Sequence, residues 1–192
     1  PRLRHIQPRL VRALTEDQVL ALLRSPDPTT WIGARDRMAL VLLIETGIRV
    51  GELCRLTTGS LLDDGTIFIQ GKGGRDRYVP ASDELRREWA VWVVRRAELR
   101  PGKRAALLIG RHGRGILPRT VRWIVDRHSR AALGRALGLH AIVRQQRPWS
   151  GFYPHLLRAT AATEWHRAGM PVSAIAETLG HSQLATTARY VA

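Results

Sequence analysis

The sequence predicts a mainly helical domain with one small antiparallel β-sheet, an α+β fold. Two observations lead to this prediction. Most of the 192 residues fall into segments with the apolar spacing of amphipathic helices, and one short region changes to β-branched and aromatic residues at strand spacing. A chain of this length can bury one full-sized hydrophobic core, so we expect residues 1–192 to form a single domain.

Three helices are predicted in the first part of the chain. Residues 14–23 (LTEDQVLALL) begin with Thr15, which can cap a helix N-terminus. Residues 34–47 (ARDRMALVLLIETG) are apolar enough for the core and end at Gly47, a residue that favours a helix C-terminus. Residues 48–61 (IRVGELCRLTTGSL) indicate a short third helix after a sharp connection.

The apolar period then changes to that of β-structure. Residues 66–70 (TIFIQ) and 76–80 (DRYVP) are short and contain β-branched and aromatic residues, with GKGGR between them. The glycines of that link can supply the positive φ angles that a tight turn needs, so we expect a β-hairpin. Residues 106–110 (ALLIG) are a candidate third strand.

The rest of the chain returns to helical spacing. Residues 82–99 begin with Ser82 as a cap and place Trp89, Trp92 and Val93 on one buried stripe. The remaining predicted elements are a helix over 117–138, a loop over 143–153, helices over 155–169 and 171–180, and a last short helical stretch over 182–192.

The chain is strongly basic, with 31 Lys and Arg residues against 16 Asp and Glu, a formal net charge of +15 at pH 7. Such a charge favours an anionic partner, and double-stranded DNA is the expected one. A membrane is not expected as a partner, because no apolar stretch reaches about 18 residues. The single Cys54 is typical of a reducing compartment, which predicts a cytoplasmic, nucleoid-associated protein.

Four short segments combine glycine-defined geometry with residues suited to phosphoryl chemistry. They are TGIRVGEL with Arg49, GKGGR with Lys72, HLLR with His155 and Arg158, and LGHSQLATTARY with His181 and Tyr190. A guanidinium fork fits the edge of a phosphate, and residues at i and i+3 near a helix N-terminus share a face that favours an anion. Taken alone, each residue is also compatible with a solvated or capping role. Glu52 either orients Arg49 or is an ordinary solvated helix carboxylate.

The order and local context of these six residues closely resemble the tyrosine recombinase (phage integrase) family. The resemblance runs from LTEDQVLALL to Tyr190 and is most specific in TGIRVGEL, GKGGRDRYVP and LGHSQLATTARY. Leu156 departs from the acidic residue that many members carry in HLLR. The resemblance implies the integrase catalytic-domain fold and a site-specific recombinase. In that family a tyrosine, here Tyr190, attacks a DNA phosphodiester to form a 3′-phosphotyrosyl intermediate, without metal, ATP or another cofactor.

The resemblance also implies roles for the other five residues. Arg49 and Arg158 would neutralise the non-bridging oxygens of the phosphate as charge builds in the transition state. Lys72 would protonate the departing 5′ oxygen. His155 would assist proton transfer at the tyrosine, and His181 would hydrogen-bond the phosphate.

Other functions remain open at this point. A type IB topoisomerase would use a similar tyrosine centre, although GKGGRDRYVP and LGHSQLATTARY are more similar to the recombinases. A non-catalytic DNA-binding module of the same fold is less favoured, because all six residues are present. A metal-dependent nuclease is least favoured, because the sequence has neither an acidic cluster for metals nor zinc-ligand spacing.

The resemblance also implies an organisation for the whole protein. Family members usually carry an N-terminal core-binding domain that clamps DNA, and a segment after the tyrosine that docks on a neighbouring protomer. The chain begins at the catalytic domain and ends two residues after Tyr190, so we expect both to be absent here. We therefore expect a monomer that binds DNA weakly, and a homotetramer on DNA for the full-length protein.

Overall fold

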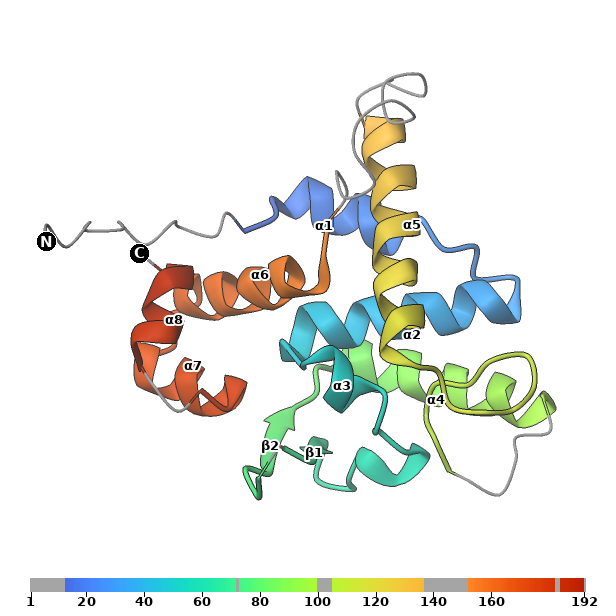
Figure 1. Cartoon of the computed structure of the whole chain (residues 1–192), viewed down its shortest axis with the longest axis horizontal. Coiled ribbons are helices and arrows are strands. Elements are labelled where there is room, and N and C mark those ends of the chain that lie inside the picture. Colours follow the sequence, from blue (N-terminus) through green and yellow to red (C-terminus); the bar gives the residue numbers. More distant parts are fainter. Residues whose placement is uncertain (1–12, 72, 100–104, 137–151, 182–183, 192) are drawn as a thin grey trace, which may run out of the picture.

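The structure is a computed structural model that describes residues 13–71, 73–99, 105–136, 152–181 and 184–191 (Figure 1). Its elements, in chain order, are α1 (Glu16–Leu23), α2 (Trp31–Thr46), α3 (Val50–Leu53), the 3-10 helix η1 (Thr58–Ser60), β1 (Thr66–Ile69), β2 (Arg77–Pro80), α4 (Asp83–Glu98), α5 (Pro118–Ala136), α6 (Pro154–Arg167), α7 (Val172–Leu179) and α8 (Leu184–Val191). The prediction of a mainly helical fold with a small antiparallel sheet is confirmed.

Local signals fix several helix ends where the sequence places them. The side chains of Thr15 and Ser82 accept hydrogen bonds from backbone N–H groups in the first turns of α1 and α4. Gly47 and Gly180 follow α2 and α7 in the left-handed conformation, with φ angles of 55° and 66°. A side chain is strained at such angles, which explains why glycine stands at both ends.

The predicted third helix is much shorter than expected. Arg49 has an extended backbone and serves as the N-cap, and α3 ends at Leu53. In the segment that follows, Ser60 Oγ accepts a hydrogen bond from the Thr57 backbone N–H at 2.9 Å. Such local side-chain bonds compete with the helical pattern, so the chain forms only the short η1 there.

The prediction of a third strand over 106–110 is wrong. Within the described ranges the sheet has two strands, β1 and β2, and Ala106 and Ile109 form only isolated bridges. The backbone bonds of this segment go to different neighbours: Leu107 N–H donates to Leu56, whereas Leu108 C=O accepts from Ile116. The segment is therefore held by irregular pairing on two sides rather than by one strand.

The hydrophobic core is built around α2, whose central residues 38–43 are fully buried. Figure 1 shows this helix in the middle of the molecule, and it packs mainly against α4 and α6. Helices α6, α7 and α8 enclose a second, smaller apolar cluster formed by Ala159, Ala162, Ile175, Leu179 and Tyr190. This cluster places the end of the described chain beside α6.

In the hairpin, Ile69 pairs with Arg77 and Ile67 with Val79. These four residues are buried, so an arginine stands on the core side of β2. In Figure 1 the hairpin lies below α7, and β2 contacts that helix.

Two absences hold for the part of the chain that the structure describes. None of its helices has the length and apolar character needed to cross a membrane. No three or more His, Cys, Asp or Glu side chains are grouped so that they could hold a metal ion.

Candidate active site

The predicted site residues come together where the end of α7 meets α6, α8 and the start of α3. Five of the six are described, and Lys72 lies outside the described residues. Tyr190 contacts both histidines, and the two arginines donate to the neighbouring backbone carbonyls of Leu179 and Gly180. They come from distant parts of the sequence: Arg49 from the start of α3, His155 and Arg158 from α6, His181 from the turn after α7, and Tyr190 from α8.

Tyr190 contacts His155 directly. The phenol oxygen lies 3.0 Å from Nε2 of His155, and the two rings meet edge to face with centroids 5.5 Å apart. The backbone carbonyl of Tyr190 accepts a hydrogen bond from Thr163 Oγ1 at 2.8 Å, which ties α8 to α6. Small residues of α6, Ala159 and Ala162, pack against the tyrosine and allow this close approach.

Arg158 is buried and connects two helix ends. Its Nη1 donates to the carbonyl of Gly47 after α2, and its Nη2 donates to the carbonyl of Leu179 at the end of α7. Burial, and then the charges of Arg49 and Arg77, lower the pKa of Arg158 to about 10. The guanidinium is still protonated at neutral pH.

Arg49 is the more open of these arginines, with 45% of its side chain exposed. Its Nη1 donates to Glu52 Oε1 at 3.0 Å and its Nη2 donates to the carbonyl of Gly180 at 3.0 Å. Glu52 also accepts from the Arg49 backbone N–H through Oε2. Because Glu52 is buried and bonded in this way, it is not the solvated carboxylate that was one of its two interpretations.

Arg77 also belongs to this cluster, although it is not among the residues that the sequence motifs indicated. Its Nη2 donates to Glu52 Oε2 at 2.8 Å and its Nε donates to the carbonyl of Thr178 at 2.7 Å. A signal was available in the sequence: the alternation of β2 puts Arg77 on the same face as Val79, and a charge on a buried face requires a partner.

His181 follows the Gly180 turn and faces the same cluster. Its Nδ1 lies 2.8 Å from Thr187 Oγ1, and its ring centroid is 5.8 Å from that of Tyr190. Burial, followed by the charges of Arg158 and Arg49, lowers the pKa of His181 to about 4. Burial and the charge of Arg158 also lower the pKa of His155. Both rings are therefore neutral at pH 7 and can accept a proton.

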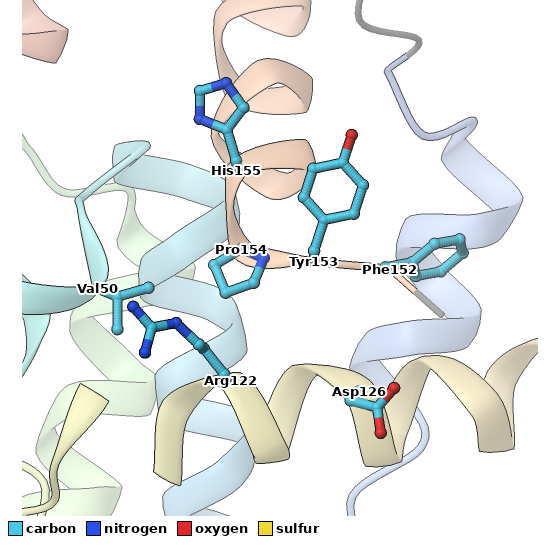
Figure 2. Close-up of a pocket in the computed structure, with 7 residues that line it drawn as sticks. All are labelled: Val50, Arg122, Asp126, Phe152, Tyr153, Pro154 and His155. Atoms are coloured by element: carbon cyan, nitrogen blue, oxygen red, sulfur yellow. The ribbon is translucent and has the colours of Figure 1, made fainter. Parts of the chain in front are cut away.

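Hollows of about 640, 470 and 410 Å³ open beside the cluster, and the first lies between residues 75–78 of the hairpin and the end of α7 at Gly180 and His181. A groove of about 470 Å³ is lined by Arg49, Glu52, Gly73, Arg75 and Gly180, and it gives Arg49 access to solvent next to the hairpin tip. A third pocket, of about 410 Å³, lies between α5 and the start of α6 (Figure 2). Figure 2 shows His155 at its edge and Arg122 extending from α5 toward Val50 and Pro154.

The chemistry of this arrangement suits a phosphodiester. Three guanidinium groups and one carboxylate leave an excess of positive charge, while the neutral histidines offer proton acceptors near a phenol. A phosphodiester carries its charge on two non-bridging oxygens, which planar guanidinium groups bind well.

Comparisons with known proteins agree with the motifs. The phage integrase family matches residues 12–192. The tyrosine recombinase XerC of Azotobacter vinelandii is 33% identical over 183 residues, which are 95% of this chain and 56% of that protein. The tyrosine recombinase XerD of Xanthomonas axonopodis pv. citri is 35% identical over an alignment of 194 residues, which covers 97% of this chain and 60% of that protein.

Solved structures show the same fold. The crystal structure of XerA recombinase has a TM-score of 0.76 and 25% identity, and the match covers 94% of this chain and 60% of that one. XerH recombinase bound to its difH substrate has a TM-score of 0.74 at 24% identity, with 94% and 49% covered. The chain spans between 49% and 60% of the length of these relatives. The integrase catalytic-domain fold that the motifs imply is confirmed, and the chain belongs to the phage integrase family of tyrosine recombinases.

Proposed function

We propose that these 192 residues act as the catalytic domain of a site-specific DNA recombinase, which cleaves and rejoins DNA through a 3′-phosphotyrosyl intermediate without metal or ATP. The observation that carries the proposal is the 3.0 Å approach of the Tyr190 phenol to a neutral His155 beside a cluster of guanidinium groups. The histidine can take the phenolic proton, and the guanidinium groups can stabilise the phosphate that the phenolate attacks.

Residues of this chain can accept and supply each proton that the cleavage step requires. The phenol oxygen of Tyr190 forms a bond to phosphorus as its proton passes to His155, and the bond from phosphorus to the 5′ oxygen breaks. Lys72 supplies the proton that makes the 5′ hydroxyl. Because a phosphotyrosyl ester replaces a phosphodiester, the 5′ hydroxyl of a partner strand can reverse the step without an external energy source.

The other groups act on the phosphate. Arg49 and Arg158 stabilise the charge on the non-bridging oxygens; each terminal guanidinium nitrogen that bonds a carbonyl keeps a second N–H for this purpose. His181 donates to the phosphate from Nε2, the ring atom that its contact with Thr187 does not use. Glu52 holds the Arg49 guanidinium from behind.

The proposed partner is double-stranded DNA. The net charge of +15 supports it, and two structural relatives, XerH recombinase and the Tn1549 transposon integrase, are seen bound to DNA. For the whole protein we propose a homotetramer on DNA that works in the cytoplasm at the nucleoid. These 192 residues alone would be a monomer that binds DNA weakly.

A nicked suicide duplex tests the proposal, because the cleaved strand end diffuses away and the covalent intermediate accumulates. We expect an SDS-resistant adduct with the unaltered chain, also in EDTA, and none with Tyr190→Phe. The chain has three tyrosines, so the double variant Tyr78→Phe, Tyr153→Phe is a matched control that should keep the adduct. An adduct that persists in Tyr190→Phe would refute the assignment, and relaxation of supercoiled DNA without site preference would favour a topoisomerase.

A further inference from the structure

Three guanidinium groups converge on the C-terminal end of α7. They donate to the carbonyl oxygens of three consecutive residues: Arg77 to Thr178 at 2.7 Å, Arg158 to Leu179 at 2.5 Å and Arg49 to Gly180 at 3.0 Å. The last carbonyls of a helix have no partner within the helix and carry the negative end of its dipole. The end of α7 therefore offsets three like charges that would otherwise repel one another.

Arg77 has a different environment from Arg49. Only 7% of the Arg77 side chain is exposed, against 45% for Arg49, and its Nε and Nη2 are both bonded within the protein, to Thr178 and to Glu52. The two are joined through one carboxylate: Arg77 Nη2 donates to Oε2 of Glu52, and Arg49 Nη1 donates to Oε1. If Arg77 moved, the buried Glu52 side chain that it bonds would move as well, and Glu52 also bonds Arg49.

The charge balance of Glu52 depends most on Arg77. Burial raises the pKa of the Glu52 carboxyl, but the hydrogen bond from Arg77 lowers it most strongly, followed by the Arg49 backbone N–H and the remaining arginine contributions. The net effect lowers the pKa to about 2. Glu52 is thus a permanent anion at neutral pH, and Arg77 is the partner that contributes most to keeping it so.

Arg77 also retains an unusual feature. Its Nη1 is buried and has no hydrogen-bond partner among the residues that the structure describes. A Cβ atom at Gly180 would lie 3.5 Å from this nitrogen and 3.5 Å from Arg49 Nη1, so both guanidinium groups flank the same turn.

We propose that Arg77 is a positioning residue of the cleavage reaction, which holds the Arg49 guanidinium through Glu52 and the His181 turn through the Thr178 carbonyl. The inference rests on the proposed function. It also connects the hairpin to the site, because Arg77 stands five residues after Lys72 and ties β2 to α7. Arg77 touches neither the substrate nor the reacting atoms; it acts through the residues that do.

The test is a double-mutant cycle on the single-turnover rate of adduct formation at saturating DNA. Misplacing a catalytic group by about 1 Å can cost on the order of 100-fold, so we expect Arg77→Ala to lower the rate by about 10- to 100-fold. In an Arg49→Ala background only the route through Thr178 remains, so the same change should cost at least about 3-fold less than in the unaltered chain, because coupled residues are not additive. Equal losses in both backgrounds would overturn the proposal.

Arg96→Ala is the matched control. Arg96 is equally buried, donates through Nε to a backbone carbonyl, that of Ala106, and also has a terminal nitrogen without a partner in the described ranges. It lies in α4, outside the cluster. We expect it to change stability while leaving the maximal cleavage rate within about 3-fold, as for a substitution with no coupling to the site. A loss equal to that of Arg77→Ala would assign both effects to stability.

Two further measurements keep the test decisive. Arg77→Lys keeps the positive charge and can form one of the two hydrogen bonds that Arg77 makes, to Glu52 or to Thr178. It should therefore fold even if Arg77→Ala does not, and it should recover part of the rate of adduct formation. The Nε–Hε NMR signals of the free protein report Arg49 without any activity: its guanidinium should rotate slowly in the unaltered chain and faster in Arg77→Lys. If the unaltered chain forms no adduct, the proposed function fails, while the NMR result still decides whether Arg77 positions Arg49. An unchanged Arg49 signal would refute it.

Discussion

The phenol oxygen of Tyr190 and Nε2 of His155 lie 3.0 Å apart, although 35 positions separate the two residues in the sequence. The bond from Thr163 to the Tyr190 carbonyl holds α8 against the helix that carries His155. The proposed nucleophile and its proposed proton acceptor are therefore in direct contact.

This contact predicts a pH dependence of cleavage. Burial and the charge of Arg158 lower the pKa of His155 below 6.5, so the ring is neutral at pH 7 and becomes protonated only on further acidification. A protonated ring cannot accept the phenolic proton, and we expect the single-turnover cleavage rate to fall as the pH drops through that lowered pKa. His155→Gln should lose roughly 10²- to 10⁴-fold in rate and also lose this acid limb. The same limb in the variant would assign it to another group.

Acid should also destabilise the fold over two successive pH ranges that overlap near pH 4. The pKa of His181 is 6.5 in the unfolded chain and about 4 in the folded one, so between these values only the unfolded chain binds the proton. The free energy of unfolding should fall as the pH drops from 6.5 toward 4, by at most about 1.4 kcal/mol per pH unit and less because the ring is partly solvated. The pKa of Glu52 is lowered from 4.5 to about 2, so the free energy of unfolding should fall a second time as the pH drops between these values.

Urea denaturation at a series of pH values measures both steps. His181→Gln should flatten the first step, and Glu52→Gln should remove the second while costing about 3 kcal/mol at pH 7, because Arg77 loses a buried charged partner. His166→Gln, at an exposed position on α6, is the control and should leave the curve unchanged. A first step of full size in His181→Gln would contradict the assignment.

Gly180 is predicted to matter for the site as well as for the backbone. Its φ angle of 66° makes any side chain there cost about 1–2 kcal/mol, and a Cβ would lie in van der Waals contact, at 3.5 Å, with the Arg49 and Arg77 guanidinium groups. Relaxation of the strained turn would shift the Gly180 carbonyl to which Arg49 donates. Gly180→Ala should therefore lower both thermal stability and the cleavage rate.

Gly169 separates these two effects. It has a φ angle of 89°, but a Cβ there would meet no atom within 4 Å. Gly169→Ala should show the backbone cost alone, with cleavage kinetics unchanged for the folded protein. Equal cleavage rates in the two variants would show that the arginines tolerate the added methyl group.

The assignment of Lys72 is a prediction from the sequence, and substrate chemistry tests it. A 5′-bridging phosphorothiolate has a thiolate leaving group, which needs little protonation. Lys72→Ala should cleave an ordinary suicide duplex poorly, by about 10²- to 10⁴-fold, and recover on the phosphorothiolate. Arg49→Ala is the comparison, since loss of phosphate stabilisation should not be rescued by a better leaving group. Failure of Lys72→Ala to recover would reassign the general acid.

Local chemistry explains why much of this protein could be predicted from its sequence. Helix periods, the caps at Thr15 and Ser82, and the left-handed glycines Gly47 and Gly180 depend on neighbouring residues, so the α+β class and most elements follow from them. The two failures had different causes, one local and one long-range. Side-chain bonds around Ser60 shortened the third helix, and residues 106–110 pair with two separate segments rather than with one strand.

The sequence by itself determined the fold class and, through the resemblance of its short motifs, indicated six of the polar residues proposed for the site, because both are written in short spacings along the chain. Only the tertiary structure decided which of them meet and what balances their charge. The bonds from Arg49 to Gly180, Arg158 to Gly47 and Arg77 to Thr178 span 131, 111 and 101 positions. Contacts over such separations depend on how the helices pack. Arg77, on a strand, therefore belongs to the site only because α7 packs against β2.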